Sequence, residues 1–167
     1  MYDELTEQDI AKMKEEIEYR KLVVRKNALE AVKEARAHGD LSENFEYHAA
    51  KKDKNQNESR IRYLERMIKT AKVVSAQSNE DEVGLNNRVE VFFEEDEETE
   101  VFTLVTTVRG NSLKGRISIE SPLGKALFGR KAGERVKVDV NENYSYYVQI
   151  KSILKQVNDE EIAIRKF

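Results

Sequence analysis

Apolar side chains recur at helical spacing between Thr6 and Val74, where intervals of three and four residues alternate. This spacing places them on one helix face, and its seven-residue repeat is typical of a coiled-coil seam. The predicted first seam contains Ile10, Met13, Ile17, Val24, Ala28, Ala31, Ala35 and His38. The predicted second seam contains Tyr47, Ala50, Lys54, Asn57, Ile61, Leu64, Ile68 and Ala71. Thr6 is expected to cap the first helix, because acidic residues occupy the following turn.

The helical pattern breaks once, at the sequence GDLSEN of residues 39–44. Gly39 suits the left-handed conformation in which many helices end, so the first helix is expected to stop there. A second helix is expected to begin near Glu43. Residues equidistant from the break should then meet, as Tyr47 and Ala35 would, in an antiparallel hairpin about 45 Å long at about 1.5 Å per residue.

Two polar residues, Lys54 and Asn57, interrupt the second seam. A buried polar residue in a coiled coil fixes the register of the helices at a cost in stability. A direct functional role is the alternative, and the sequence leaves both open.

Beyond Val74 the hydrophobic period changes to the two-residue alternation of strands, after a polar, turn-rich linker of residues 75–87. The expected strands are Val89–Phe93, Val101–Val105, Arg116–Glu120, Arg135–Val140 and Tyr144–Leu154. Ser121 and Pro122 are expected to open a short helix that Gly129 ends. The C-terminal part is therefore predicted to be a small sheet domain with one helix.

Together these patterns predict an α+β chain of two domains, a helical hairpin over residues 1–74 and a sheet domain over residues 88–167. The composition fits a large surface around a small core, with 37% charged residues, 39% hydrophobic residues and a mean hydropathy of -0.73. The absence of cysteine excludes disulfides and thiolate ligands, and with only two histidines a zinc site is not expected. No apolar run suits a signal peptide or a membrane span, which favours a cytoplasmic protein.

Charge is unevenly distributed beside the break. The basic residues there are Lys33, Arg36, His38, Lys51, Lys52 and Lys54, and the acidic residues are Asp40, Glu43 and Glu46. A basic shaft could hold a phosphate backbone while the carboxylates face it, although an ordinary solvated helix face has the same composition. Tyr47 could stack on a base or pack against Ala35.

The pair Asp40 and Glu43 admits two interpretations. Asp-x-x-Glu before a helix is a capping-box pattern, in which Asp40 accepts a backbone N–H and Glu43 reaches back. The same carboxylates form part of a metal site, but with water alone they would hold Mg²⁺ weakly, since this ion usually shares its ligands with a substrate phosphate. Another protein would have to complete such a site.

Two segments resemble a known protein family. Residues 34–52, EARAHGDLSENFEYHAAKK, resemble the signature of bacterial GreA/GreB transcript cleavage factors, and residues 121–136, SPLGKALFGRKAGERV, resemble the matching segment of their C-terminal domain. The resemblance follows the chain order throughout: coiled-coil hairpin, tip, linker and sheet domain. It implies that residues 88–167 form an FKBP-like domain.

The resemblance implies an accessory factor without turnover of its own. The C-terminal domain would bind bacterial RNA polymerase at the rim of its secondary channel, and the hairpin would reach the active site. There Asp40 and Glu43 would help to hold a Mg²⁺ ion of the polymerase, and Ser42 would orient a water or the RNA, so that the polymerase cleaves a backtracked transcript. The residues expected to face the RNA 3′ end are Arg36, Tyr47, Lys51 and Lys52.

The resemblance places polymerase docking on the best-matched motif of the C-terminal domain, with Ser121, Pro122, Leu123, Lys125 and Phe128 as the expected contacts. That helix could instead simply complete the core. The protein is expected to be a monomer, more GreA-like than GreB-like because its basic cluster is moderate. The acidic turn Glu94–Glu100 receives no role.

Three other functions are less well supported. A Gre-like inhibitor that plugs the channel would carry a more aspartate-rich tip than the plain pair Asp40 and Glu43. A peptidyl-prolyl isomerase or chaperone would need an aromatic pocket, and the chain has no tryptophan. A purely structural coiled coil would leave the sheet domain and the acidic tip unexplained.

Overall fold

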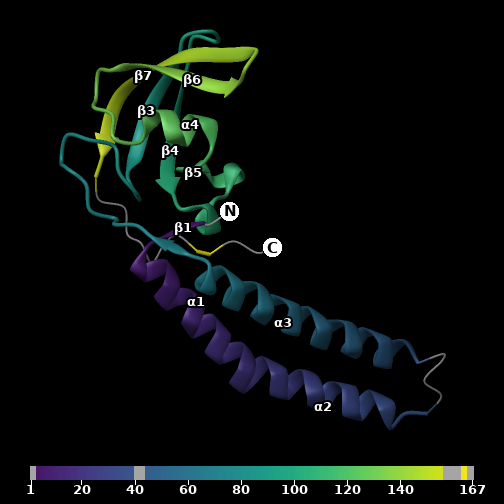
Figure 1. Cartoon of the computed structure of the whole chain (residues 1–167). Coiled ribbons are helices and arrows are strands. Elements are labelled where there is room, and N and C mark those ends of the chain that lie inside the picture. The colour runs from purple at the N-terminus through teal and green to yellow at the C-terminus, as the bar shows by residue number, and fades with distance from the viewer. Residues whose placement is uncertain (1–2, 40–43, 156–162, 165–167) are drawn as a thin grey trace. The chain divides into compact units, whose positions relative to one another are not determined.

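The computed structural model describes residues 3–39, 44–155 and 163–164, and these form two compact units. One unit contains residues 10–71, the helical hairpin. The other contains residues 3–9 together with residues 72–155, the sheet unit, so residues 3–9 belong with the C-terminal part. Figure 1 shows the helices and the curled sheet.

The hairpin unit consists of long helices that run antiparallel, as the sequence predicted (Figure 1). The helices are α1 (Glu7–Tyr19), the short π-helical turn η1 (Arg20–Val24), α2 (Arg25–Arg36) and α3 (Phe45–Lys69). Ion pairs cross between the helices at 2.7 Å from Lys21 to Glu65 and at 2.7 Å from Arg25 to Glu58. Ile61 and Leu64 of the predicted second seam are buried.

The first seam is correct up to η1. Beyond η1 it is correct at Ala28, which is half-buried, and at Ala35, which is buried, but Ala31 and His38 are exposed and Val32 is half-buried in place of Ala31. The physical reason is the π turn, which holds one residue more than an α-helical turn and therefore rotates every later side chain by one position.

The sheet unit contains a five-stranded sheet with the strand order β5-β4-β3-β7-β6. The strands are β3 (Arg88–Phe93), β4 (Glu98–Val105), β5 (Arg116–Ser118), β6 (Arg135–Asn141) and β7 (Tyr144–Leu154). Neighbours are antiparallel except β4 and β5, which are parallel. Two 3₁₀ turns, η2 (Thr107–Arg109) and η3 (Ser112–Lys114), occupy the connection between that parallel pair.

One helix, α4 (Pro122–Leu127), covers the core of this sheet. The alternating strand residues that the sequence predicted to face inward do so; Val89, Val91, Val138 and Val148 are fully buried. Leu127 of α4 is also fully buried in this cluster. The prediction of an α+β chain with one short helix over a sheet is confirmed.

Residues 3–9 are fixed to the sheet unit by backbone and side-chain bonds. Strand β1 (Glu4–Leu5) pairs in parallel with β2 (Lys72–Val73). Thr6 caps α1, as predicted, because its Oγ1 accepts from the N–H of Asp9 at 3.1 Å while the Asp9 carboxylate accepts from the N–H of Thr6 at 2.9 Å. Asp9 also bonds the buried Arg109 and accepts from the Thr106 hydroxyl at 2.7 Å.

Candidate functional site

The two helices of the hairpin are tied together beside the tip by one side chain. Asn44 is the N-cap of α3, and its Oδ1 accepts from the N–H of Tyr47 at 3.0 Å. Its Nδ2 donates to the carbonyl of Ala35, near the end of α2, at 2.7 Å. Gly39 takes the positive φ expected of it, 120°. The end of α2 and the start of α3 are thus joined through one asparagine side chain.

The carboxylates assigned to the tip, Asp40 and Glu43, lie outside the described residues, and so does Ser42. The capping-box interpretation of this pair is wrong, since the N-cap of α3 is Asn44 and the helix begins at Phe45 rather than near Glu43. Sequence reasoning missed Asn44 because Asp and Asn are about equally good N-caps.

The basic face beside the tip is formed from both helices. Arg36, at the end of α2, lies with its guanidinium 5.7 Å from the centre of the half-buried Tyr47 ring. A hydrogen bond with Arg36, together with the charges of Lys51 and Lys54, lowers the pKa of Tyr47 below its ordinary value. Lys51 and Lys52 are exposed on α3. Several cationic side chains thus lie on this face, and such side chains are suited to contact a phosphate backbone.

Phe45 is a further candidate that the sequence reasoning overlooked. It is the first residue of α3, and its side chain is 86% exposed. An exposed aromatic ring directly after the tip is costly to leave in water and is well suited to stack on a nucleotide base. Its position beside the acidic motif was the signal that could have found it.

The predicted docking residues divide between the core and the surface. Ser121 caps α4, with its Oγ accepting from the N–H of Gly124 at 3.1 Å, and Leu123 packs against the hydrophobic core. Pro122, Lys125 and Phe128 are exposed at three-residue spacing, which puts them on one side of α4. The helix thus completes the core with one side and leaves the other available.

Within the described part of the chain, no group of three or more His, Cys, Asp or Glu side chains gathers as a metal site would require. The donor set proposed for the tip, two carboxylates, suits Mg²⁺ chemically but leaves most of its six positions to water or to another molecule. In the same residues no helix is long and apolar enough to cross a membrane.

Two family models cover almost the entire chain. The N-terminal model of a transcription elongation factor matches residues 4–73, and the C-terminal model of the transcription elongation factor GreA/GreB matches residues 77–155. The chain belongs to the GreA/GreB family. The resemblance seen in the sequence is thereby confirmed for the family and for both halves of the chain.

Curated GreA proteins are similar to this chain over most of their length. The transcription elongation factor GreA of Caldanaerobacter subterraneus subsp. tengcongensis is 44% identical over 137 residues, which cover 81% of this chain and 87% of that protein. The GreA of Prosthecochloris aestuarii is 39% identical over 154 residues, 90% of this chain and 96% of the relative. These similarities make the chain a member of a family of transcription elongation factors.

Solved structures of related factors are also similar. A structure of the transcription factor Gfh1 is 24% identical, covers 92% of this chain and 97% of that chain, and has a TM-score of 0.46. The GreA factor homolog 1 of Thermus thermophilus is 24% identical over 92% of this chain and 99% of that chain, with a TM-score of 0.43. At these TM-scores neither likeness says anything of function.

Proposed function

We propose that this GreA/GreB family member binds bacterial RNA polymerase and stimulates the polymerase to cleave its own backtracked transcript. The sheet unit docks at the rim of the secondary channel, and the hairpin enters the channel with its acidic tip. The protein is an accessory factor in this reaction, and the polymerase supplies the active site. The inhibitory alternative, in which the hairpin only plugs the channel, is an outcome of the test below.

The observation that carries the proposal is the construction of the closed end of the hairpin. The bonds of Asn44 to Ala35 and Tyr47 hold the end of α2 against the start of α3. The 25 residues of α3 correspond to about 37 Å at 1.5 Å per residue, a suitable reach for a channel. A long hairpin whose two helix ends are joined by side-chain bonds is suited to reach into a partner.

The residues near this end have separate roles in the proposal. Asp40 and Glu43 lie between Gly39 and Asn44 in the sequence and provide the carboxylates for an ion shared with the polymerase. A second Mg²⁺ in such a centre activates water and neutralises charge on the leaving oxygen. Ser42 orients the water or the RNA.

The basic face binds the displaced RNA. Arg36, Lys51 and Lys52 offer cations to its phosphates, and the exposure of these three side chains on the two helices supports this role. Tyr47 is covered by Arg36 and half-buried, so the more exposed ring of Phe45 is better placed to stack on a base.

Docking is proposed for the exposed side of α4, formed by Pro122, Lys125 and Phe128. The turn before it is rigid, because the Ser121 hydroxyl donates to the carbonyl of Ser118 at 2.6 Å and accepts from the next turn of the helix. Ser121 and Leu123 act indirectly, by holding this surface in place. A rigid surface loses little conformational entropy when it binds.

The test uses purified RNA polymerase stalled in a backtracked complex with end-labelled RNA. The wild-type protein is expected to accelerate RNA shortening in Mg²⁺. Asp40→Asn is expected to slow the stimulated reaction by roughly 100-fold, the size of effect found when one electrostatic stabiliser of a transition state is removed. Its binding, measured by competition with labelled wild-type protein, should not change.

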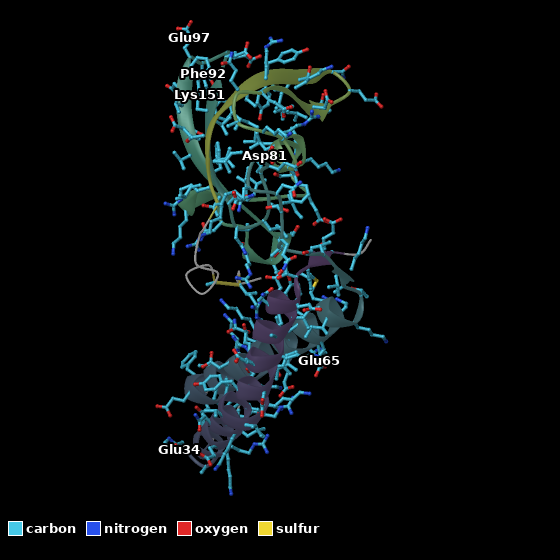
Figure 2. All side chains as sticks on the ribbon, turned by 90° about the vertical axis from the view of Figure 1, so that its left-hand side faces the viewer. Glu34, Glu65, Asp81, Phe92, Glu97 and Lys151 are labelled. Carbon is cyan, nitrogen blue, oxygen red and sulfur yellow. The ribbon has the colours of Figure 1, made fainter. Side chains whose placement is uncertain are left out.

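Glu34→Gln is the matched control, since it neutralises another exposed acid of the hairpin, on α2 (Figure 2). This variant should cleave at the wild-type rate. If neither the wild-type protein nor Asp40→Asn shortens the RNA and both slow elongation, the cleavage proposal is wrong and the inhibitory function replaces it.

A further inference from the structure

One turn of the first long helix departs from the α-helical period. Over η1 the N–H of Arg25 bonds the carbonyl of Arg20, five residues back rather than four. A π turn contains one extra residue, so every later side chain shifts by one position, about 100° around the axis. The exposure of Ala31 and the partial burial of Val32 are the visible result.

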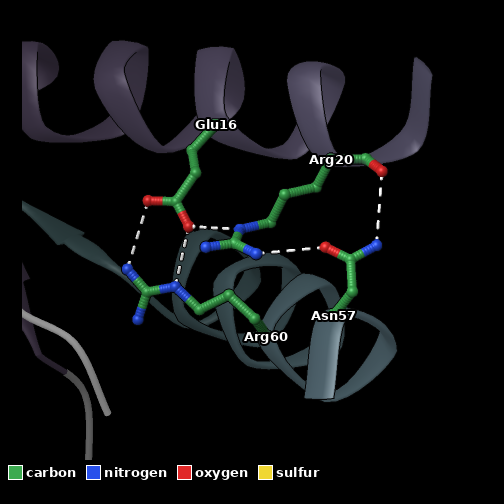
Figure 3. Close-up of polar contacts among 4 residues, drawn as sticks. All are labelled: Glu16, Arg20, Asn57 and Arg60. Carbon is green, nitrogen blue, oxygen red and sulfur yellow. Dashed lines mark hydrogen bonds and ion pairs between the residues drawn. The ribbon is translucent and has the colours of Figure 1, made fainter. Parts of the chain in front are cut away.

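The side-chain amide of Asn57 binds this turn from the opposite helix (Figure 3). Its Oδ1 accepts from Nη1 of Arg20 at 3.0 Å, and its Nδ2 donates to the backbone carbonyl of Arg20 at 3.3 Å. The Arg20 carbonyl therefore accepts from two donors, the N–H of Arg25 and the amide of Asn57. An amide offers an acceptor and a donor on separate atoms, whereas leucine has neither and an ionised aspartate has no donor.

Ion pairs fix the position of the Arg20 side chain. Glu16 accepts from Nε of Arg20 at 2.7 Å and from Arg60 at 2.8 and 3.2 Å (Figure 3). Burial alone would raise the pKa of Glu16, but the hydrogen bonds from Arg60 and Arg20 lower it below the ordinary value. A slip of α3 by one turn would bring Lys54 or Ile61 to Arg20, and neither can make these bonds, so the network specifies one register.

The rotation imposed by the π turn reaches the closed end of the hairpin. In this rotation the carbonyl of Ala35 accepts from Asn44 at 2.7 Å, and the guanidinium of Arg36 lies over Tyr47. If η1 became ordinary α-helix, the positions of Ala35 and Arg36 against α3 would each be taken by the residue one earlier in the sequence. The charged Glu34 would then occupy the buried position of Ala35. The rotations of α2 with and without the π turn exclude each other. The turn therefore determines which residues at the C-terminal end of α2 face α3.

We propose that Asn57 is a positioning residue, whose amide holds the π turn of η1 and so sets the rotation in which α2 meets α3 beside the tip. The consequence for cleavage rests on the proposed function above. The rotation itself is a property of the isolated protein and is tested without the polymerase.

The chain has no cysteine, so a single introduced thiol reports the rotation by its rate of reaction with a maleimide. In the otherwise wild-type chain, Ala31→Cys should react faster than Val32→Cys, because the first position is exposed and the second half-buried. In an Asn57→Leu background the π turn relaxes, and the order of the two rates should be reversed. Asn57→Ala is a second background in case leucine perturbs the seam.

The matched control is Asn55→Leu, the same substitution at an exposed position of α3. It should preserve the wild-type order of the thiol rates. If Asn57→Leu and Asn57→Ala also preserve that order, Asn57 does not set the rotation and the proposal is overturned.

The second measurement is RNA cleavage in the backtracked complex at saturating protein. Asn57→Leu should lower the rate by roughly 10- to 100-fold, because a displacement of about 1 Å at a reacting centre can cost about 100-fold. Its melting temperature should not fall, since a polar residue in a coiled-coil seam fixes the register at a cost in stability that leucine does not carry, and its competition binding should match that of the wild type. If Asn57 had only a structural role, its substitution would change the melting temperature and leave the maximal rate of RNA cleavage unchanged.

The outcomes of the two tests are distinguishable. A reversed order of thiol rates with a wild-type cleavage rate overturns the positioning role. If the wild-type protein does not accelerate cleavage, the proposed function fails, and the thiol rates still decide whether Asn57 sets the rotation of α2.

Discussion

The buried ion pair between Asp9 and Arg109 is expected to be the most sensitive point of the sheet unit. Both side chains are only 1% exposed, and Asp9 also accepts from the Thr106 hydroxyl and from the N–H of Thr6. Asp9→Asn preserves the shape and an acceptor for the helix cap but leaves the Arg109 charge buried. Removing one partner of a buried pair costs about 3–5 kcal/mol, whereas replacing both by apolar residues is often neutral.

The expected loss is therefore about 3 kcal/mol, which corresponds to a fall in melting temperature of about 12 °C for a unit of about 100 residues. Differential scanning calorimetry of the full chain measures it, and the infrared band of β-structure identifies the transition of the sheet unit. The double variant Asp9→Asn with Arg109→Met should regain most of the loss, because no charge then remains buried and the amide still offers an acceptor to the Thr6 N–H and the Thr106 hydroxyl.

The control for this prediction is Asp81→Asn, which removes the exposed partner of Lys131 in the same unit (Figure 2). Their side chains are 64% and 56% exposed and lie 3.2 Å apart, so water replaces the lost contact and the melting temperature should not change. The reasoning is refuted if Asp9→Asn shifts the melting temperature no more than this exposed substitution does.

Two further predictions concern one unit each. Hydrogen bonds from Arg60 and Arg20 lower the folded-state pKa of Glu16 below 4.5. The contribution of Glu16 to hairpin stability is therefore complete above about pH 4.5 and is lost as the pH falls through the folded pKa. In circular dichroism melts, the stability lost between about pH 5 and pH 3 should be smaller in Glu16→Gln than in the wild type. Gly124→Ala should destabilise the sheet unit by about 1–3 kcal/mol or more in urea titrations, since its Cβ would lie 1.9 Å from the backbone carbonyl oxygen of Ser118; a wild-type midpoint would contradict the close approach.

Local signals in the sequence were sufficient for most of the fold. Tyr144–Leu154 was predicted with its observed bounds, and the cap of α4 at Ser121 followed from a serine before a proline. The contact of Asp9 with Arg109 could not be predicted, because the two residues lie far apart in the sequence and an arginine within strand-rich sequence shows no sign of burial. The same holds for the π turn, whose residues contain neither glycine nor proline.

The candidate site shows the same division. Lys51 and Lys52 could be placed on an exposed helix from periodicity alone, but the acidic pair Asp40 and Glu43 was ambiguous, since the pattern also fits a helix cap. The structure assigns the cap of α3 to Asn44. The chemical role of the pair still rests on the family and on the proposed experiment.

The π turn acts together with Asn57 of α3 and with Asn44, the N-cap of that helix. Asn57 and Asn44 each donate to a carbonyl of the opposite helix, those of Arg20 and Ala35. In the sequence, Arg20 and Ala35 are two residues further apart than Asn44 and Asn57. If both helices were regular α-helices, the distance between the two carbonyls would exceed the distance between the two asparagines by about 3 Å along the axis. A π turn between the carbonyls accommodates an extra residue without a full step of rise, so it absorbs part of this mismatch and lets both bonds form at once. Polar residues of the hairpin therefore help to fix the relative positions of the two helices at the closed end. Apolar seam residues alone would contribute only stability there.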